Sequence, residues 1–440
     1  MQEYFYALAD AITASLHGDE FYTCTFHAED SDFVRFNRSA IRQAGTVVQR
    51  FLSLDLIHGS RHAAAEVALS GDFDSDRAHV SQLLPELREK LPYLPEDPHL
   101  LYATAVQSSM HEGENHLPDR ADAVAAVLDA GIGRDLVGFY ASGGIYAGFA
   151  NALGQRNWFA SFTFNCDWSF YYQCDKAVKT SYAGFVWEPA VFARKVSEAA
   201  EQLDVLGRPP RTIPPGGYRV YLAPAALYDI LQLLAWGGFG LKDHRTKQTT
   251  LLKMVEEGVH LHPAITIREN TRHGVAPNFQ EAGFIKPDHV TLIEAGAFHD
   301  CLVSPRSAKE YEVPTNGASG AEAPESVEMA AGDIAHADLL RRLDTGVYIN
   351  NVWYLNYSDR SACRMTGMTR FATFWVERGR IQAPLSVMRF DESIYRMFGD
   401  HLLGLTAERD FILDPSTYHR RSSDSSRLPG ALVEQFNFTL

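Results

Sequence analysis

Residues 207–217 divide this chain more sharply than any other segment of its sequence. They read Gly-Arg-Pro-Pro-Arg-Thr-Ile-Pro-Pro-Gly-Gly, with four prolines and three glycines in eleven residues. Proline removes a backbone donor, and glycine weakens both helices and strands, so no regular element can run through this segment. We therefore predict a linker at 207–217, between an N-terminal domain of residues 1–206 and a C-terminal domain of residues 218–440.

The part before the linker mixes helix signals with strand signals. Asp119 can cap a helix predicted over Ala121–Ala130. A second helix is predicted over Pro189–Leu206, because it starts with proline and Gly207 follows its end. Residues Gly138–Phe164 are expected to form a strand, a turn and a second strand, with the Ser-Gly-Gly run at 142–144 and Gly154 as turn residues. These patterns predict a mixed α/β-type domain.

The part after the linker begins with a strand at Tyr218–Leu222 and a helix from Ala223, and its hydrophobic pattern then changes. Beyond residue 255 it consists mostly of short runs in which apolar and polar residues alternate, as they do in antiparallel strands. The runs cover Val259–Ile267, Val290–Ile293, Gly346–Tyr354, Phe371–Val376 and Leu385–Phe390. We therefore predict an α+β protein whose C-terminal domain is built on a large, mainly antiparallel β-sheet with few helices.

The charge and the cysteine content of the chain indicate its cellular compartment and the kinds of partner that it can bind. The chain carries 40 Lys and Arg residues against 55 Asp and Glu residues, a formal net charge of −15, whereas a nucleic-acid partner calls for a basic face. Five scattered cysteines do not form a disulfide framework and indicate a reducing compartment. The acidic N-terminus has no signal-peptide pattern, and no apolar run is long enough to span a bilayer. We expect a cytoplasmic protein that binds neither nucleic acid nor membrane.

The sequence His-Glu-Gly-Glu-Asn-His at 111–116 is the first candidate for chemistry. It could hold zinc through His111 and His116, with Glu112 as the general base. However, the histidines are five residues apart, so a regular helix would place them about 140° apart rather than on one face. The glycine and asparagine between them are poor helix formers. The pattern therefore favours a polar loop that leads into the helix capped by Asp119, with a zinc site as the alternative.

From about Tyr218 onward, the sequence resembles the TldD/PmbA family of metalloproteases. The resemblance lies in the order and spacing of several short segments spread over about half the chain. These segments are Val220–Ala226, Thr291–Gly296, Thr345–Ile349, Phe374–Gly379, Pro384–Phe390 and Pro429–Leu440. The N-terminal half fits the family in organisation more than in motif.

The resemblance implies a two-subunit enzyme in which one kind of subunit binds zinc. That subunit carries H-E-x-x-x-H in the helix that follows the "LAP"-like strand, and a cysteine near the C-terminus. In this chain the matching positions hold Gln232, Leu233 and Trp236 or Gly237, and the segment Arg420–Pro429 contains no cysteine. The resemblance therefore implies a TldE/PmbA-like subunit that has no metal ligands of its own, with zinc expected in the partner.

Together these observations predict a catalytically inactive, non-metal-binding subunit of a cytoplasmic metalloprotease complex that degrades or matures peptides and unfolded segments. Its partner would be a TldD-like zinc-bearing subunit in a heterodimer, or a second copy in a homodimer. Arg370 and Arg389 are polar residues set in apolar runs and are candidates for a peptide groove. Two alternatives stay open: an autonomous zinc metallopeptidase that uses His111, Glu112 and His116, and a non-enzymatic peptide-binding or regulatory protein.

Overall fold

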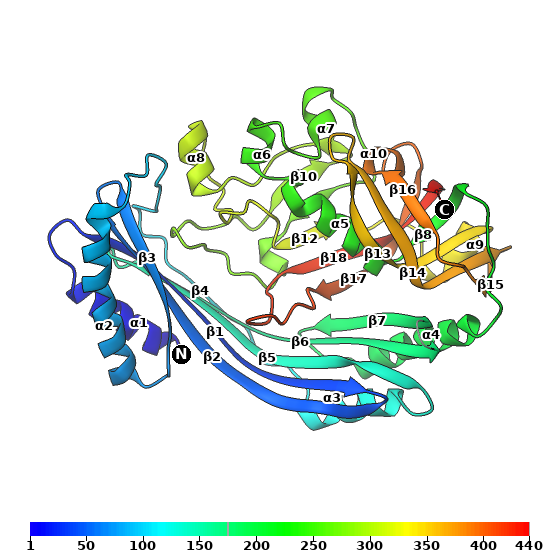
Figure 1. The fold of residues 1–440 in the computed structure, drawn as a ribbon, viewed down its shortest axis with the longest axis horizontal. Coiled ribbons are helices and arrows are strands. Elements are labelled where there is room, and N and C mark those ends of the chain that lie inside the picture. The colour runs from blue at the N-terminus through cyan, green and yellow to red at the C-terminus, as the bar shows by residue number, and fades with distance from the viewer. Residues whose placement is uncertain (174–175, 440) are drawn as a thin grey trace.

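A computed structural model describes residues 1–173 and 176–439, which form two β-sheets with helices packed against them. The first sheet runs from blue to green in Figure 1 and curves along the lower left of the molecule. The second sheet, from green to red, lies above it and to the right. The mixed α+β fold expected from the sequence is confirmed. No helix in the described part of the chain is long and apolar enough to cross a membrane.

The first sheet has the strand order β3-β2-β1-β5-β6-β4, with β7 paired to β6. Neighbouring strands run antiparallel, except that β4 runs parallel to β6. Its strands are β1 (Phe21–Asn37), β2 (Ala40–His58), β3 (Arg61–Ala68), β4 (Ser109–Glu112), β5 (Asp135–Asn151), β6 (Arg156–Gln173) and β7 (Lys176–Gly184).

Alternation along the strands gives the first sheet two different faces. Phe26 and Leu52 are fully buried beneath the helices α1 and α2, whose Phe5 and Leu84 belong to the same core. The residues one position along, such as Thr25, point to the opposite face. The helices of this half are α1 (Gln2–Ala14), α2 (Phe73–Lys90), α3 (Arg120–Ala130) and α4 (Pro189–Leu206), with a 3₁₀ turn at Leu91–Tyr93.

The second sheet has the order β11-β10-β9-β12-β18-β16-β14-β13-β8, with β15 paired to β14 and β17 paired to β18. It is mainly antiparallel, as predicted; β12–β18 and β13–β8 are its parallel pairs among the described residues. Its strands are β8 (Gly216–Leu222), β9 (Ile267–Glu269), β10 (Val290–Glu294), β11 (Ala297–Phe298), β12 (Ser326–Met329), β13 (Gly346–Asp359), β14 (Arg364–Glu377), β15 (Arg380–Pro384), β16 (Arg389–Ser393), β17 (Leu402–Leu413) and β18 (Ser425–Phe438).

The longest helix of this half, α5, packs into the core of the second sheet. Its buried face includes Leu227, Ile230 and Leu234, one helical turn apart. The helices are α5 (Pro224–Gly238), α6 (Leu241–Arg245), α7 (Leu252–Glu256), α8 (Pro305–Tyr311), α9 (Leu339–Leu343) and α10 (Ile394–Met397), with 3₁₀ turns at Thr271–His273 and His336–Asp338.

Two local predictions were wrong. The run at 142–144 is not a turn, because it lies inside β5, where Gly143 pairs with Ser31 of β1. A Cβ atom on Gly143 would lie 2.1 Å from the carbonyl oxygen of Asp30, so glycine is needed there for the close approach of two strands. Residues 259–266 are not a strand either, since β9 begins only at Ile267.

Candidate functional site

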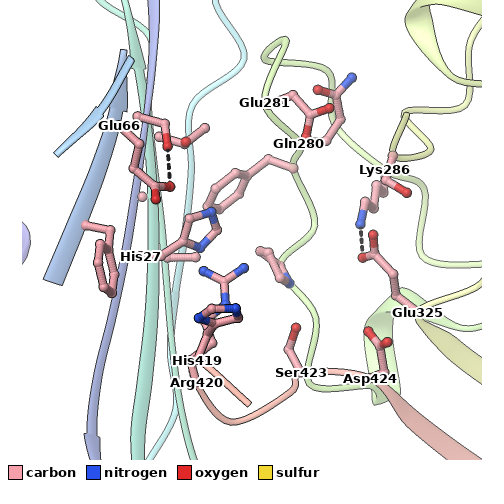
Figure 2. Close-up of a pocket in the computed structure, with 18 of the residues that line it drawn as sticks. His27, Glu66, Gln280, Glu281, Lys286, Glu325, His419, Arg420, Ser423 and Asp424 are labelled. Atoms are coloured by element: carbon pink, nitrogen blue, oxygen red, sulfur yellow. Dashed lines mark hydrogen bonds and ion pairs between the residues drawn. The ribbon is translucent and has the colours of Figure 1, made fainter. Parts of the chain in front are cut away.

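A cleft of about 820 Å³ lies between the first sheet and three segments of the second half of the chain. We call it the cleft, and Figure 2 shows it with the sheet on one side and the loops on the other. Polar and charged side chains dominate its lining. The lining residues are Thr25, His27, Phe51, Ser53, Glu66, Ala147, Gly148, Pro277, Phe279, Gln280, Glu281, Lys286, Ser319, Glu325, Tyr418, His419, Arg420, Ser423 and Asp424.

The wall formed by the first sheet follows from strand register. Thr25 pairs with Ser53, and Ser53 pairs with Glu66, so these side chains share the face that α1 and α2 leave open. Ser53 Oγ donates a hydrogen bond to Glu66 Oε2 at 2.9 Å. Burial, with a smaller contribution from the Arg420 cation, lowers the pKa of His27 to about 4. His27 therefore presents a neutral imidazole, able to donate and to accept, at neutral pH.

The opposite wall of the cleft carries several charged side chains. Lys286 Nζ forms an ion pair with Glu325 Oε2, drawn as a dashed line in Figure 2. Asp424 lies beside this pair, and burial, followed by the Glu325 and Asp414 carboxylates, raises its pKa to about 6. Asp424 can therefore exchange its proton close to neutral pH.

The loop at 414–424 carries much of the cleft lining and is held to the first sheet by Arg421. This side chain is buried, and its guanidinium donates hydrogen bonds to Thr163 O at 2.9 Å and Thr163 Oγ1 at 2.7 Å. It also donates to Ser31 Oγ and Gly143 O, both at 3.3 Å. The backbone N–H of Arg421 donates to Glu29 Oε2 at 2.8 Å. Burial lowers the pKa of Arg421 to about 10, which still leaves it charged at neutral pH.

The structure places residues 111–116 away from the cleft lining and partly corrects the expected loop. His111 and Glu112 belong to β4, so their side chains leave opposite faces of the strand. His111 stacks on Phe159 with ring centroids 5.1 Å apart, and Glu112 Oε2 accepts a hydrogen bond from Trp158 Nε1 at 2.9 Å. His116 Nε2 lies 2.8 Å from a carboxylate oxygen of Glu114. Among the described residues, no group of three or more His, Cys, Asp and Glu side chains is arranged to hold a metal ion.

Arg370 and Arg389 lie on the second sheet rather than at the cleft. Arg389 pairs with Met368, and Arg370 follows Met368 by two residues on β14, which places both arginines on one face. The guanidinium of Arg370 lies 4.8 Å from the ring centroid of Trp353, and Arg389 Nε donates to Thr366 Oγ1 at 3.2 Å.

Residues 215–440 match the family model described as the PmbA/TldA metallopeptidase C-terminal domain, which spans half of the chain. The chain belongs to the PmbA/TldD family. Solved structures show that the fold of this family extends over the whole chain. TldE from Thermococcus kodakarensis aligns with a TM-score of 0.78 at 13% identity, covering 99% of this chain and 100% of that one.

Two other family-like structures agree with this fold. A proposed modulator of a DNA gyrase from Thermotoga maritima aligns with a TM-score of 0.76 at 13% identity and covers 99% of both chains. A proposed modulator of DNA gyrase from Bacteroides thetaiotaomicron aligns with a TM-score of 0.74 at 14% identity, covering 99% of this chain and 98% of that one. No curated protein matches the chain. At these identities the likeness concerns the fold alone.

The two segments that the family resemblance matches to the zinc-binding parts lie close together here. The helix α5 packs against β18, which begins within the 420–429 segment. Asp424, in that segment, contributes to raising the pKa of Tyr228 on α5, after burial, Asp414 and Asp229. Gln232 follows Tyr228 by one helical turn and is exposed, as is Trp236, which is 62% exposed. The helix loses its regular geometry at this point, because Gly237 adopts φ 77°.

Only indirect signs of the cleft are present in the sequence. Thr25, His27 and Ser53 could have been noticed as polar residues that alternate with a fully apolar strand face. The segments 277–286 and 319–325 also line the cleft, but they contain no sequence motif. They reach the cleft because distant strands pair in the folded chain.

Proposed function

We propose that this chain is the metal-free subunit of a cytoplasmic PmbA/TldD-type peptidase, and that it binds peptide while a TldD-like partner supplies zinc. One observation carries the proposal. The positions that the family resemblance assigns to zinc ligands hold Gln232, Leu233 and Trp236 or Gly237, and the Arg420–Pro429 segment offers hydroxyls in place of a thiolate. Amide, aliphatic, indole and hydroxyl groups do not replace imidazole and thiolate as zinc ligands.

The cleft is the proposed peptide site. Its volume of about 820 Å³ lies within the usual range of ligand pockets. An extended peptide presents alternating N–H and C=O groups. The cleft can meet both kinds, since Lys286, Arg420 and Ser423 can donate hydrogen bonds while Glu66 and Glu281 can accept them. Its role would be to bind and position the peptide, while the partner's metal would activate water for hydrolysis.

Arg370 and Arg389 are retained as a second proposed peptide contact, on a face separate from the cleft. The exposed Trp353 and Met368 beside them would add apolar contact area. The fold shared with a protein named TldE supports the choice of subunit type. The partner would be a zinc-bearing homologue in a heterodimer or a second copy of this chain.

The test compares three samples: this chain alone, a zinc-bearing homologue alone, and the two together. Each is analysed for metal content, for mass in solution and for cleavage of an unstructured peptide. We expect peptide binding but no cleavage by this chain alone, and faster cleavage by the mixture than by the homologue alone. Cleavage by this chain alone, with one zinc per chain, would favour the autonomous peptidase. Absence of both peptide binding and association would favour a regulatory protein of another kind.

A further inference from the structure

A second hollow of about 380 Å³ lies beside the cleft, and we call it the side chamber. The two hollows share Thr25, Ser53, Gln280 and Glu281 in their linings, so they are direct neighbours. The side chamber differs from the cleft in that much of its lining is apolar. Ile57, Ala64, Leu100, Leu101 and Tyr102 contribute to it.

Charged groups gather at one part of the side chamber. His62 lies between two carboxylates, with Nδ1 3.0 Å from Asp55 Oδ2 and Nε2 3.7 Å from Asp97 Oδ2. Arg306 Nη1 lies 2.6 Å from the same Asp97 oxygen. With Glu281 also in the lining, the chamber holds three carboxylates against one guanidinium, and its histidines are His62 and His99. Burial raises the pKa of Asp55 even though His62 opposes the shift, so a cation near Asp55 would stabilise its ionised form.

Gln280 lies at the point where the two hollows meet, since it lines both of them. Its side chain is 6% exposed. Its Oε1 accepts the backbone N–H of Ala282, which determines which end of the amide carries the nitrogen. Gln280 Nε2 then has no hydrogen-bond acceptor within residues 1–173 and 176–439. This nitrogen is also closed off from solvent, so Gln280 forms part of the shared wall of the two hollows rather than a contact for a ligand.

We propose that the side chamber takes the lysine or arginine side chain of a peptide bound in the cleft. The apolar lining suits the methylene stem of a long cationic side chain, and the carboxylates suit its head. An acidic side chain would meet the surplus of carboxylates and be repelled. A purely apolar side chain would displace water from the Asp55 carboxylate without offering a hydrogen-bond donor in its place. This inference rests on the proposed peptide-binding role of the cleft and names the class of peptide.

The experiment measures binding of fluorescent peptides to the full chain by anisotropy. Three peptides differ at one central residue, which is lysine, norleucine or glutamate. We expect the lysine peptide to bind about tenfold more tightly than the norleucine peptide, as a charge-assisted contact would give, and the glutamate peptide to bind least. Asp55→Asn should remove the advantage of lysine, whereas Asp122→Asn, an exposed carboxylate on α3, should leave it unchanged.

One further variant keeps the test decisive if Asp55→Asn folds poorly. Ala64→Phe changes an exposed residue of the edge strand β3 and should fill the chamber, so it should weaken the binding of the lysine and norleucine peptides alike. Binding of all three peptides with equal affinity overturns the side-chamber assignment and leaves the proposed function intact. Failure of every peptide to bind overturns the proposed function itself.

Discussion

Replacement of Arg421 by methionine should destabilise the protein and release the 414–424 loop from the first sheet. Methionine matches the length of the side chain but donates no hydrogen bond, so the guanidinium contacts with Thr163, Ser31 and Gly143 are all lost. Glu29, which is only 2% exposed, would keep the backbone N–H of residue 421 but lose the neighbouring cation. The substitution therefore leaves the buried neutral acceptors without their donor and removes a positive charge from the surroundings of Glu29.

The magnitude follows from these contacts. The two short bonds to Thr163 contribute at least about 1.5 kcal/mol each, since hydrogen bonds to charged groups are the stronger kind. The longer bonds to Ser31 and Gly143 add little. Loss of the cation near buried Glu29 adds a smaller electrostatic cost, which brings the total to about 3 to 4 kcal/mol. Detachment of the loop would limit the loss, so about 3 kcal/mol is expected.

Urea unfolding followed by circular dichroism measures this difference, with the slope against urea as the check on a single transition. Arg42→Met, at an exposed position of β2, is the matched control and should change the free energy of unfolding by less than about 0.5 kcal/mol. Glu29→Gln combined with Arg421→Met should be more stable than Arg421→Met alone, because the carboxylate that lost its neighbouring cation is gone. A loss below about 1 kcal/mol in Arg421→Met, with an unchanged urea slope, would refute the reasoning.

Three shorter predictions test other parts of the molecule. The purified chain should contain no stoichiometric zinc by mass spectrometry, and His116→Ala should not change its metal content; one zinc per wild-type chain that disappears in the variant would support the autonomous peptidase. The pKa of Asp424 is raised to about 6 in the folded chain, so the folded state holds this proton more tightly than the unfolded state, and stability falls as the pH rises from about 4 to about 6. Asp424→Asn should therefore raise the free energy of unfolding by about 2 kcal/mol at pH 8 and change it little at pH 4, whereas an equal effect at both pH values would contradict a titrating carboxyl. Gly143→Ala should cost about 2–4 kcal/mol, since its Cβ would collide with the carbonyl of Asp30, while Gly154→Ala, which has open space around it, should cost about 1 kcal/mol; equal melting temperatures for the two variants would count against the close-approach argument.

Local signals in the sequence predicted the helices well. The helix predicted over Pro189–Leu206 has these bounds in the structure, because proline at its first position and Gly207 after its end act through the adjacent backbone alone. Asp119 likewise caps α3 by accepting the N–H of Ala121. Such signals need no knowledge of distant residues, and they were sufficient here.

Features that depend on distant residues were not predicted. The glycines at 142–144 resemble turn residues in sequence, but Gly143 is needed because β1 crosses close to β5, more than a hundred residues away along the chain. The cleft has the same origin. His27 and Asp424 belong to opposite ends of the chain, and they face one cleft only because the 414–424 loop returns to the first sheet. Alternation can indicate which face of a strand is polar, but it does not indicate what lies opposite that face.

The same loop explains why loss of a metal ligand need not mean loss of the site. In the zinc-bearing subunits that the family resemblance implies, the segment matching Arg420–Pro429 supplies a thiolate. Here it supplies Arg421, which holds the loop to the first sheet, and Asp424, which lines the cleft. A loop that had only lost its ligand would be expected to lose its fixed position as well, because ordering it costs conformational entropy. Instead, a buried arginine with five polar contacts to the first sheet keeps the loop in place. The contacts therefore stabilise the walls of the cleft through this chain's own side chains, and the proposed peptide-binding role requires such fixed walls.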